Sequence, residues 1–530
     1  MHRSRSGSHP VEHESDDFVS IDARSDFEAQ VRVTCPDKTG LGSDIARTVF
    51  DFGLVTTKGD FATDGKWAFV LVTVVAQSFL SASRGSPASG GARSGRPEKN
   101  PRGHHLDGAP VNWNLLRVRL ENLCPSKQSI STLSSLNLAA YAGSDNRENA
   151  SSSRDVFERG SQGHVNEPRP GTMYILQVEV EDRVGLLHDV TQELWASELT
   201  VRRAHISTSP ADTAVDLFYV TDERDELPAE ARVAEISRAV QRVSGRRGGG
   251  TARVVLTPAP AFVSARRSDA ARLFEQGSIG RIETASATQY TEATVTVDNL
   301  MSEKHTVFQI RTRDRKGLLY DVLRASKDLE VKVNYAKVEM RDGVPGRNSG
   351  SSFRETRLEM RDDDDHGHGQ GGHLCEIDLF VGRCTDVRER RYLCQRYKEN
   401  VERPVSVQIM TAGLDETTTE LRVIAPLDIS GFTRPRVLLD VTEALRQLRV
   451  MVFKADILID DRSGAVGSEF GGGSVRGSGF GDDGRYGDGG GATRCTEVHR
   501  FLLTDAHGQP ISSVRDRKVV CNRVLGVLLQ

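Results

Sequence analysis

The segments DRVGLLHDV, from Asp182, and DRKGLLYDV, from Asp314, share seven of their nine positions. A third version, DKTGLGSDI from Asp37, keeps both aspartates, the glycine and the first leucine, and RPRVLLDV from Arg434 is a weaker fourth. Self-similarity of this kind is the signature of a repeat architecture. The second aspartate of the motif recurs at intervals of 145, 132 and 119 residues, as Asp44, Asp189, Asp321 and Asp440. Four homologous units therefore account for the 530 residues.

Each copy has the same surroundings. Alternating or apolar runs that predict strands precede the motif, at 29–34, 174–180, 307–312 and 420–425. After the motif, apolar residues recur at helical spacing, as in Leu186, Val190 and Leu194, which predicts a helix of about three turns. Two more strands and a second amphipathic helix follow, and short strands at 252–257 and 405–410 are expected to close copies two and three. The unit reads β-α-β-β-α-β, the ferredoxin-like arrangement of the α+β class.

The third strands of copies two and three carry a recurring acid-x-Phe pattern, Asp216 with Phe218 and Asp378 with Phe380. Between and within the units lie polar stretches rich in Gly, Ser, Arg or Asp, which cannot bury enough apolar surface to offset chain entropy and are expected to be flexible. The predicted organisation is a disordered tail 1–23, unit one 24–141 (insertion 81–108), a linker 142–171, unit two 172–257, a linker 258–304, unit three 305–412 (insertion 342–372), and unit four 418–530 (insertion 461–492).

The overall charge and composition exclude several classes of protein. Lys and Arg number 70 against 74 Asp and Glu, a net charge of −4, so the basic footprint of a nucleic-acid binder is missing. The sequence contains no run of about 18 apolar residues that would span a membrane. Seven cysteines, an odd number without a Cys-x-x-Cys pair, fit a reducing compartment, and no secretory signal is recognised at the N-terminus. We therefore expect a cytoplasmic protein.

The repeated motif lies where a strand ends and a helix begins, so its backbone N–H groups are at the positive end of a helix dipole, which suits a carboxylate or phosphate. Glycine allows close approach and unusual φ angles, and the aspartate can cap the helix or orient the loop. A plain strand-to-helix turn, whose glycine meets a steric need, is the alternative interpretation of the same residues.

A β-α-β-β-α-β unit with an Asp-x-x-Gly-Leu turn resembles the ACT domain, a small regulatory module that typically binds amino acids. Four tandem copies resemble the plant ACT domain repeat proteins, whose units are similar to the C-terminal ACT modules of bacterial PII uridylyltransferase. The likeness rests on motifs in a fixed order: CPDKTGLGSD from Cys35, GLLHDVTQ from Gly185, VDN from Val297, KGLLYDV from Lys316, and RPRVLLDVTEAL from Arg434.

The resemblance implies a regulatory protein that takes a free amino acid as ligand, needs no cofactor, has no catalytic activity and acts on an unknown protein partner. Its modules would pair edge to edge within the chain, with a homodimer as a further possibility. The ligand loops would be those of copies one to three, with Asp37, Gly40, Leu41; Asp182, Gly185, Leu186; and Asp314, Gly317, Leu318. Copy four has Arg436 at the glycine position after Pro435, so we expect it to be structural.

Three other interpretations of the function stay open. The same strand order occurs in RNA-recognition modules, and residues 67–70, Trp-Ala-Phe-Val, resemble their aromatic strand, although only copy one has them. A protein-interaction scaffold that has lost ligand binding is a second alternative. An enzyme is disfavoured because the sequence contains no Walker loop, Gly-x-Ser-x-Gly or His-Glu-x-x-His, and His188 has no recurring counterpart. The acidic and histidine-rich stretch 362–375 matches no standard zinc spacing, so no metal site is predicted.

Overall fold

The computed structural model describes residues 18–77, 79, 110–125, 173–209, 211–245, 252–259, 285–286, 292–341, 373–412, 418–460 and 496–529. The four insertions and linkers predicted at 81–108, 142–171, 342–372 and 461–492 lie outside these ranges. Each motif opens a helix of eleven residues, as its apolar spacing predicts: α1 (Leu41–Asp51), α5 (Leu186–Ala196), α8 (Leu318–Asp328) and α10 (Val437–Gln447).

Within the described residues the strands form two sheets, one of eight strands and one of nine. The first has the order β1 (Val19–Ala23), β2 (Glu28–Pro36), β4 (Trp67–Ala76), β3 (Leu54–Thr63), β12 (Val333–Arg341), β13 (Leu374–Gly382), β11 (His305–Arg313), β10 (Ala293–Asp298). The second has the order β8 (Arg253–Pro258), β5 (Met173–Glu181), β7 (Thr213–Asp222), β6 (Leu199–Thr208), β16 (Met451–Asp460), β17 (Thr496–Thr504), β15 (Thr418–Pro426), β14 (Ser406–Ala412), β9 (Ala285–Ser286).

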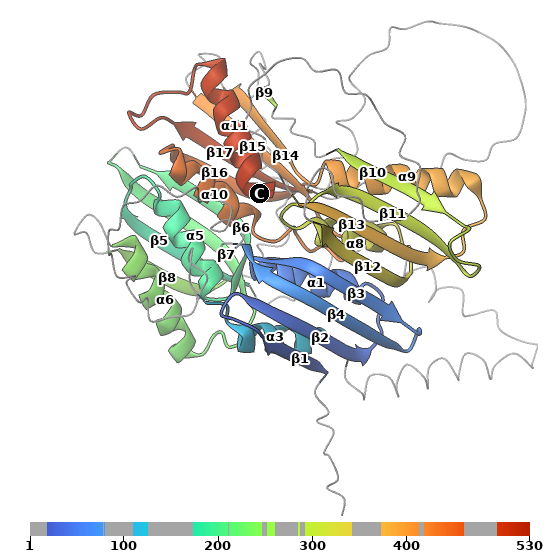
Figure 1. The fold of residues 1–530 in the computed structure, drawn as a ribbon. Helices are drawn as coiled ribbons and strands as arrows, with labels where there is room; N and C mark the ends of the chain where they lie inside the picture. Colours follow the sequence, from blue (N-terminus) through green and yellow to red (C-terminus); the bar gives the residue numbers. More distant parts are fainter. Residues whose placement is uncertain are drawn as a thin grey trace, which may run out of the picture.

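The four units, called modules 1 to 4 below (19–123, 173–258, 293–402 and 406–529), pair alternately along the chain. Module 1 joins module 3 through antiparallel β3 and β12, and module 2 joins module 4 through β6 and β16. Figure 1 shows the two pairs as separate halves, with blue and yellow strands in one half and green and orange-red strands in the other. Pairing within the chain is thus confirmed, and it covers sheet edges that would otherwise be open to association.

The strand at the edge of each module differs from the prediction in three of the four modules. Module 2 has the predicted order and ends with β8, but β1, β10 and β14 each precede the first strand that they cover. The tail 1–23 therefore contains β1, and the linker 258–304 contains β10. The strand predicted at 405–410 does not close copy three, because β14 pairs with β15 of module 4. The ferredoxin-like layout is kept in space, while the edge strand comes from the other end of the unit.

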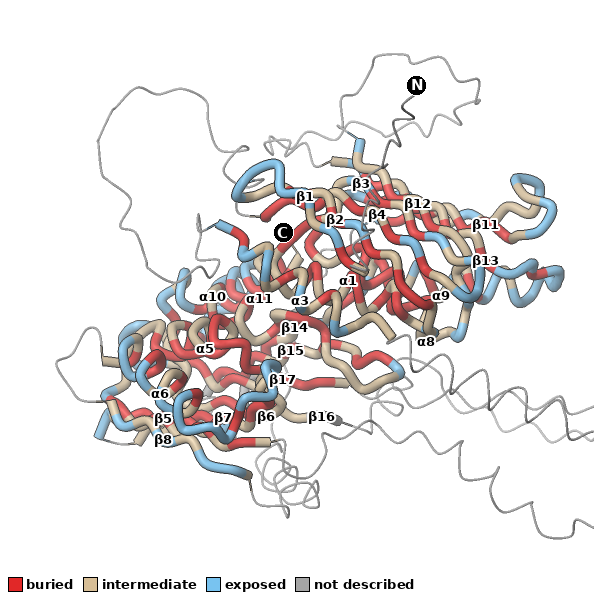
Figure 2. Tube along the Cα trace, turned by 90° about the horizontal axis from the view of Figure 1, so that it is seen from below, coloured by how far each residue is buried: buried red, intermediate tan, exposed pale blue. Residues whose placement is uncertain are grey.

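One layer of helices covers one face of each sheet. The second helices of the modules are α3 (Trp113–Leu123), α6 (Glu230–Ser244), α9 (Val387–Glu402) and α11 (Val514–Leu529). Strands alternate between buried and partly exposed residues, as β5 does along its length, so only the helix-covered face is fully buried. One apolar core runs through modules 1 and 3 and a second through modules 2 and 4, which gives the buried bands in Figure 2.

The acid-x-Phe pattern of the third strands is not structurally equivalent in the two copies. Phe218 lies opposite Leu176 in β5, whereas the residue in the matching place of module 3, opposite Phe308, is Leu379. A shift of one residue exchanges the two faces of a strand. Asp216 therefore points inward with 1% of its surface exposed, while Asp378 is only half-buried.

Because of this shift, module 2 carries an acid in its interior, and its stability should depend on pH. Burial, reinforced by the nearby Asp182, raises the pKa of Asp216 to about 8. The folded state therefore favours the protonated acid, and the associated stability is complete below pH ~4 and lost as the pH rises towards 8.

We expect Asp216→Asn to stabilise the protein at pH 8 by about 1–3 kcal/mol, below the ~6 kcal/mol limit that the shift sets, because surrounding groups relax. The gain should be smaller at pH 5.5. Urea unfolding at the two pH values measures it, with Asp378→Asn as the control on the outward face. An equal effect at both pH values would contradict the assignment of an inward, protonated acid.

Candidate functional site

The three glycine loops have the geometry that the motif predicts. Gly40, Gly185 and Gly317 are the N-cap residues of α1, α5 and α8, with φ of 81°, 82° and 73° in the left-handed region. Other residues rarely adopt this conformation, which explains the glycine. The leucines that follow, Leu41, Leu186 and Leu318, are buried in the cores, and each backbone N–H donates a hydrogen bond of 3.1 Å to the carbonyl three residues earlier in the loop.

In modules 1 and 2 the loop aspartate orients the loop. Asp37 accepts a hydrogen bond of 2.6 Å from the Thr63 hydroxyl, and Asp182 accepts one of 2.7 Å from Thr208. Both threonines end the second strand of the module, and none of the three helices has a side-chain cap bond at its N-cap glycine. Asp37 and Asp182 thus tie the loop to the sheet, which is the loop-orienting role of the two that the sequence allows.

A side chain of the paired module covers each loop glycine. A Cβ built on Gly40 would lie 2.8 Å from Lys327 Cε, one on Gly185 3.0 Å from Arg446 Cγ, and one on Gly317 2.7 Å from Phe50 Cε1. Lys327, Arg446 and Phe50 each hold the tenth position of the first helix of the partner module. The same structural position therefore closes all three loops.

In module 4 an arginine replaces the loop glycine, and it also contacts the tenth helix residue of the paired module. Arg436 takes the glycine place as N-cap of α10, with φ of 65°, and its guanidinium lies 4.9 Å from the ring centre of Trp195. Trp195 is the tenth residue of α5. Arg436 also donates a hydrogen bond of 3.4 Å to the carbonyl of Asp51. An arginine side chain therefore occupies the space that the other loops leave to glycine.

The predicted ligand residues lie in three separate loops, and two of these loops contain little free space in the structure. The cavities beside Gly317 and Gly185 measure about 30 and 20 Å³. A water molecule needs roughly 10–15 Å³ by this kind of measure, so each cavity has room for about one or two waters. An amino acid enters these two loops only if the covering side chain moves.

Buried ion pairs join the loops of modules 3 and 4. Asp321, fully buried, pairs with Arg315 of its own loop at 2.5 Å and with Arg434 of module 4 at 3.3 Å. In return Lys316 pairs with Asp440 at 2.7 Å. Burial alone would raise the pKa of Asp321, but Arg434 and Arg315 outweigh it and hold the pKa below its usual value.

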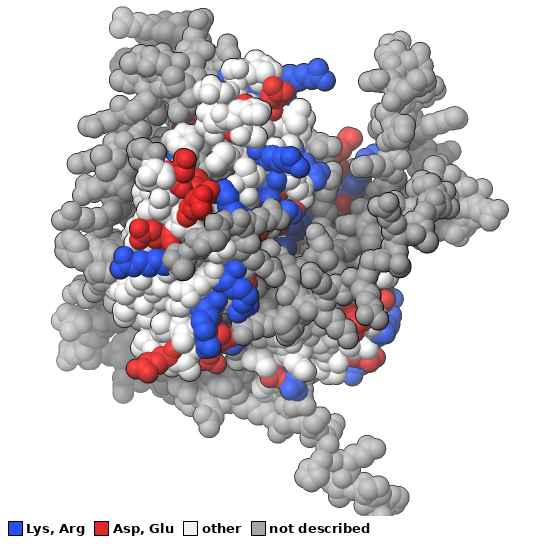
Figure 3. Space-filling view, turned by 90° about the vertical axis from the view of Figure 1, so that its left-hand side faces the viewer, with Lys and Arg blue, Asp and Glu red and all other residues white. Residues whose placement is uncertain are grey.

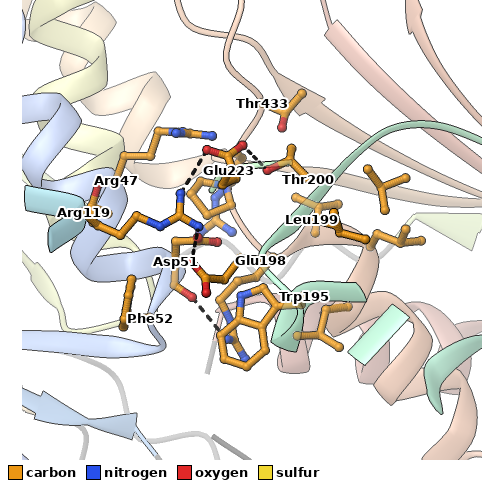
Figure 4. Close-up of a pocket in the computed structure, with 18 of the residues that line it drawn as sticks. Arg47, Asp51, Phe52, Arg119, Trp195, Glu198, Leu199, Thr200, Glu223 and Thr433 are labelled. Atoms are coloured by element: carbon orange, nitrogen blue, oxygen red, sulfur yellow. Dashed lines mark hydrogen bonds and ion pairs between the residues drawn. The ribbon is translucent and has the colours of Figure 1, made fainter. Parts of the chain in front are cut away.

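A cavity of about 300 Å³ lies where modules 1, 2 and 4 meet, and no motif in the sequence indicates it. Its walls come from the ends of α1 and α3, the end of α5 with β6, and the loop before α10. Arg119 spans the wall, with its guanidinium 3.0 Å from both Glu198 and Glu223, as Figure 4 shows. This volume is at the lower end of small-molecule sites.

Two residues that the sequence singled out have structural surroundings. His188 is buried between α5 and α10, with Nε2 3.1 Å from Glu443, and burial lowers its pKa. Cys35 is buried at the end of β2. Most of the stretch 362–375 lies outside the described residues, among which no cluster suited to a metal ion occurs.

Charge on the described part of one face of the molecule is mixed. On the face drawn in Figure 3, Lys and Arg are interspersed with Asp and Glu and do not form a basic patch. None of the helices in the described part of the chain is both long and apolar enough to cross a membrane.

Family models match all four modules. They are the N-terminal region of ACT domain-containing protein ACR10 (residues 21–86), the ACT domain (174–238), the ACR9-like ACT-like domain (294–346) and the C-terminal region of ACR9 (419–463). Fold and loops thus define a repeat of ACT modules, and the chain belongs to the plant ACT domain repeat family.

Two relatives from Arabidopsis thaliana match along most of the chain. ACT domain-containing protein ACR9 is 29% identical over 503 residues, 94% of each chain, and ACR10 is 28% identical over 451 residues, 84% of this chain and 89% of its own. A bifunctional uridylyltransferase/uridylyl-removing enzyme of Rhodospirillum rubrum is 31% identical over 162 residues, which are 15% of that enzyme. Among solved structures, an aspartate kinase from Synechocystis covers 68% of this chain and 55% of its own, with 11% identity and a TM-score of 0.25.

Proposed function

We propose that this ACT-repeat regulatory protein is an amino-acid sensor without catalytic activity, in which a free amino acid binds at the loops of modules 1 to 3 and alters module pairing. The proposal rests on one observation above all, the partner-module side chain over every loop glycine. A cytosolic location is part of the proposal, and the absence of a disulfide among the six described cysteines fits a reducing compartment.

The covering side chains would couple ligand to pairing. Arg446 reaches Gly185 from α10 of the paired module, so an amino acid at Gly185 must displace a residue whose helix belongs to the other half of the pair. A ligand shifts an equilibrium only by its difference in affinity for the two states. Displacement of Arg446 supplies such a difference, and a partner protein would then recognise the altered surface.

The loop of module 2 offers a clean test. Arg446 is 44% exposed and pairs with Glu443 on its own helix, so Arg446→Ala should cost little stability. Replacing the glycine itself is a poorer test, because Gly185 at φ 82° strains any other residue.

We expect calorimetric titration with the twenty amino acids to find a ligand, and Arg446→Ala to bind it about tenfold more tightly, since the competing side chain is gone. Arg238→Ala, an exposed change on α6, is the matched control and should bind like the wild type. If neither the wild type nor Arg446→Ala binds any amino acid, the covered loops favour the scaffold alternative and the sensor proposal is wrong. Equal affinity in all three proteins would remove the loop of module 2 as the site.

A further inference from the structure

The cavity at the junction of modules 1, 2 and 4, called the central cavity below, contains charged groups that the protein does not pair. Asp51, on the last turn of α1, lines it. Its carboxylate has no hydrogen bond or salt bridge within 4 Å to another described residue. Burial raises the pKa of Asp51, and Arg47 and Arg436 nearby offset this only in part. Asp51 is half-buried, and a carboxylate partly removed from water without a hydrogen-bond donor favours a cationic or N–H partner.

Two guanidinium groups lining the same cavity also have unused hydrogen-bonding capacity. Arg47 lies 4.6 Å from the ring centre of Phe432, and its buried Nε has no hydrogen-bond partner among the described residues. Arg436 stacks on Trp195, and its Nε has no hydrogen bond but lies 3.8 Å from the carboxylate of Asp440. A planar guanidinium is suited to a carboxylate. In contrast, Arg119 forms ion pairs with Glu198 and Glu223.

The remaining walls are apolar or weakly polar. Leu115, Leu199 and Phe52 line the cavity, together with the indole of Trp195, which lies beside Glu198 and Asp51 in Figure 4. A cavity with one unpaired carboxylate, two guanidinium groups and an apolar wall matches a ligand with an ammonium, a carboxylate and an apolar side chain.

We propose that the central cavity is a second ligand site, which binds a small zwitterion of the α-amino acid class with an apolar side chain. The ligand carboxylate contacts Arg47 and Arg436, the ammonium contacts Asp51, and the side chain packs against Trp195 and Leu199. The cavity is separate from the three loops, so binding there does not depend on the loops holding a ligand. Because its walls come from both module pairs, the ligand holds the two halves of the molecule together.

Trp195 supplies a direct reporter, since the sequence has three tryptophans and only this one lines the cavity. In a Trp67→Phe, Trp113→Phe background of the full chain, we expect L-leucine to change the Trp195 emission with a saturable curve. L-leucine methyl ester and N-acetyl-L-leucine, which each lack one charge, should bind at least about tenfold more weakly.

Asp51→Asn, which keeps the shape of the side chain, should weaken L-leucine binding at least about tenfold, and Arg47→Gln should do the same, because each loses a charge-assisted contact. Glu121→Gln on α3, outside the cavity, is the control. Thermal melting checks that the variants fold. No L-leucine-dependent change in Trp195 emission, or unchanged binding in both variants, would overturn the site. Arg446→Ala distinguishes the two proposals, because it changes loop binding and leaves the Trp195 titration unaltered.

Discussion

Replacing Asp321 by alanine should lower the free energy of unfolding by about 3–5 kcal/mol, because it leaves buried positive charges without their partner. Asp321 has no exposed surface, and Arg315 and Arg434, which both pair with it, are 6% and 1% exposed. Arg434 comes from module 4, so the substitution should also loosen the docking of module 4 on module 3. Urea unfolding of the full chain at pH 7 measures the cost.

Asp189→Ala is the matched control for this prediction. Asp189 holds the same motif position in module 2 and also pairs with the basic residue of its loop, Arg183, at 2.6 Å, but its side chain is 36% exposed. Exposed pairs contribute about 0–1 kcal/mol. Equal costs for the two substitutions would show that burial of the Asp321 cluster does not set its energetic weight.

Gly317→Ala should destabilise the protein by about 2–5 kcal/mol, the second large effect that the structure predicts. The φ of 73° costs a residue with a Cβ about 1–2 kcal/mol. The new Cβ would also lie 2.7 Å from the Phe50 ring and 2.8 Å from Arg434, both buried and unable to move freely. Overpacking of this kind adds about 1–3 kcal/mol.

Gly508→Ala separates the two contributions. Gly508 has nearly the same φ, 74°, but nothing lies within 4 Å of a Cβ built on it. Its substitution should therefore cost only the backbone strain. Thermal and urea unfolding of both variants give the difference, and a Gly317→Ala variant no less stable than Gly508→Ala would mean that the loop of module 3 is not closed by Phe50 and Arg434.

The local pattern of the sequence was sufficient to predict the helices and the repeat. Apolar spacing placed α5 and α8 directly after their glycines, because a buried helix face leaves a regular trace in the sequence. The pairing of strands that are far apart in the sequence produces no such regular pattern. Residues 293–298 alternate as a strand does, yet nothing local says whether β10 covers β11 or belongs to a linker. The same ambiguity led to the wrong partner for β14.

The loops and the central cavity differ in how far they could be predicted. The glycine positions follow from the motif, since a left-handed N-cap requires glycine or a strained residue such as Arg436. The side chains that cover these N-cap positions, such as Trp195 and Arg446, share the tenth place in their helices, and this shared place is the signal that could have identified them. Asp51, Arg47 and Arg119 come together only because modules 1, 2 and 4 meet, which no motif encodes.

An amino acid at the loops should change how the modules pair, and hydrogen–deuterium exchange of the full chain with and without saturating amino acid measures this change. We predict slower exchange in the loops at 37–41 and 182–186, and altered exchange where β6 pairs with β16. Unchanged exchange in both the loops and the pairing strands, with every one of the twenty amino acids, would contradict the account.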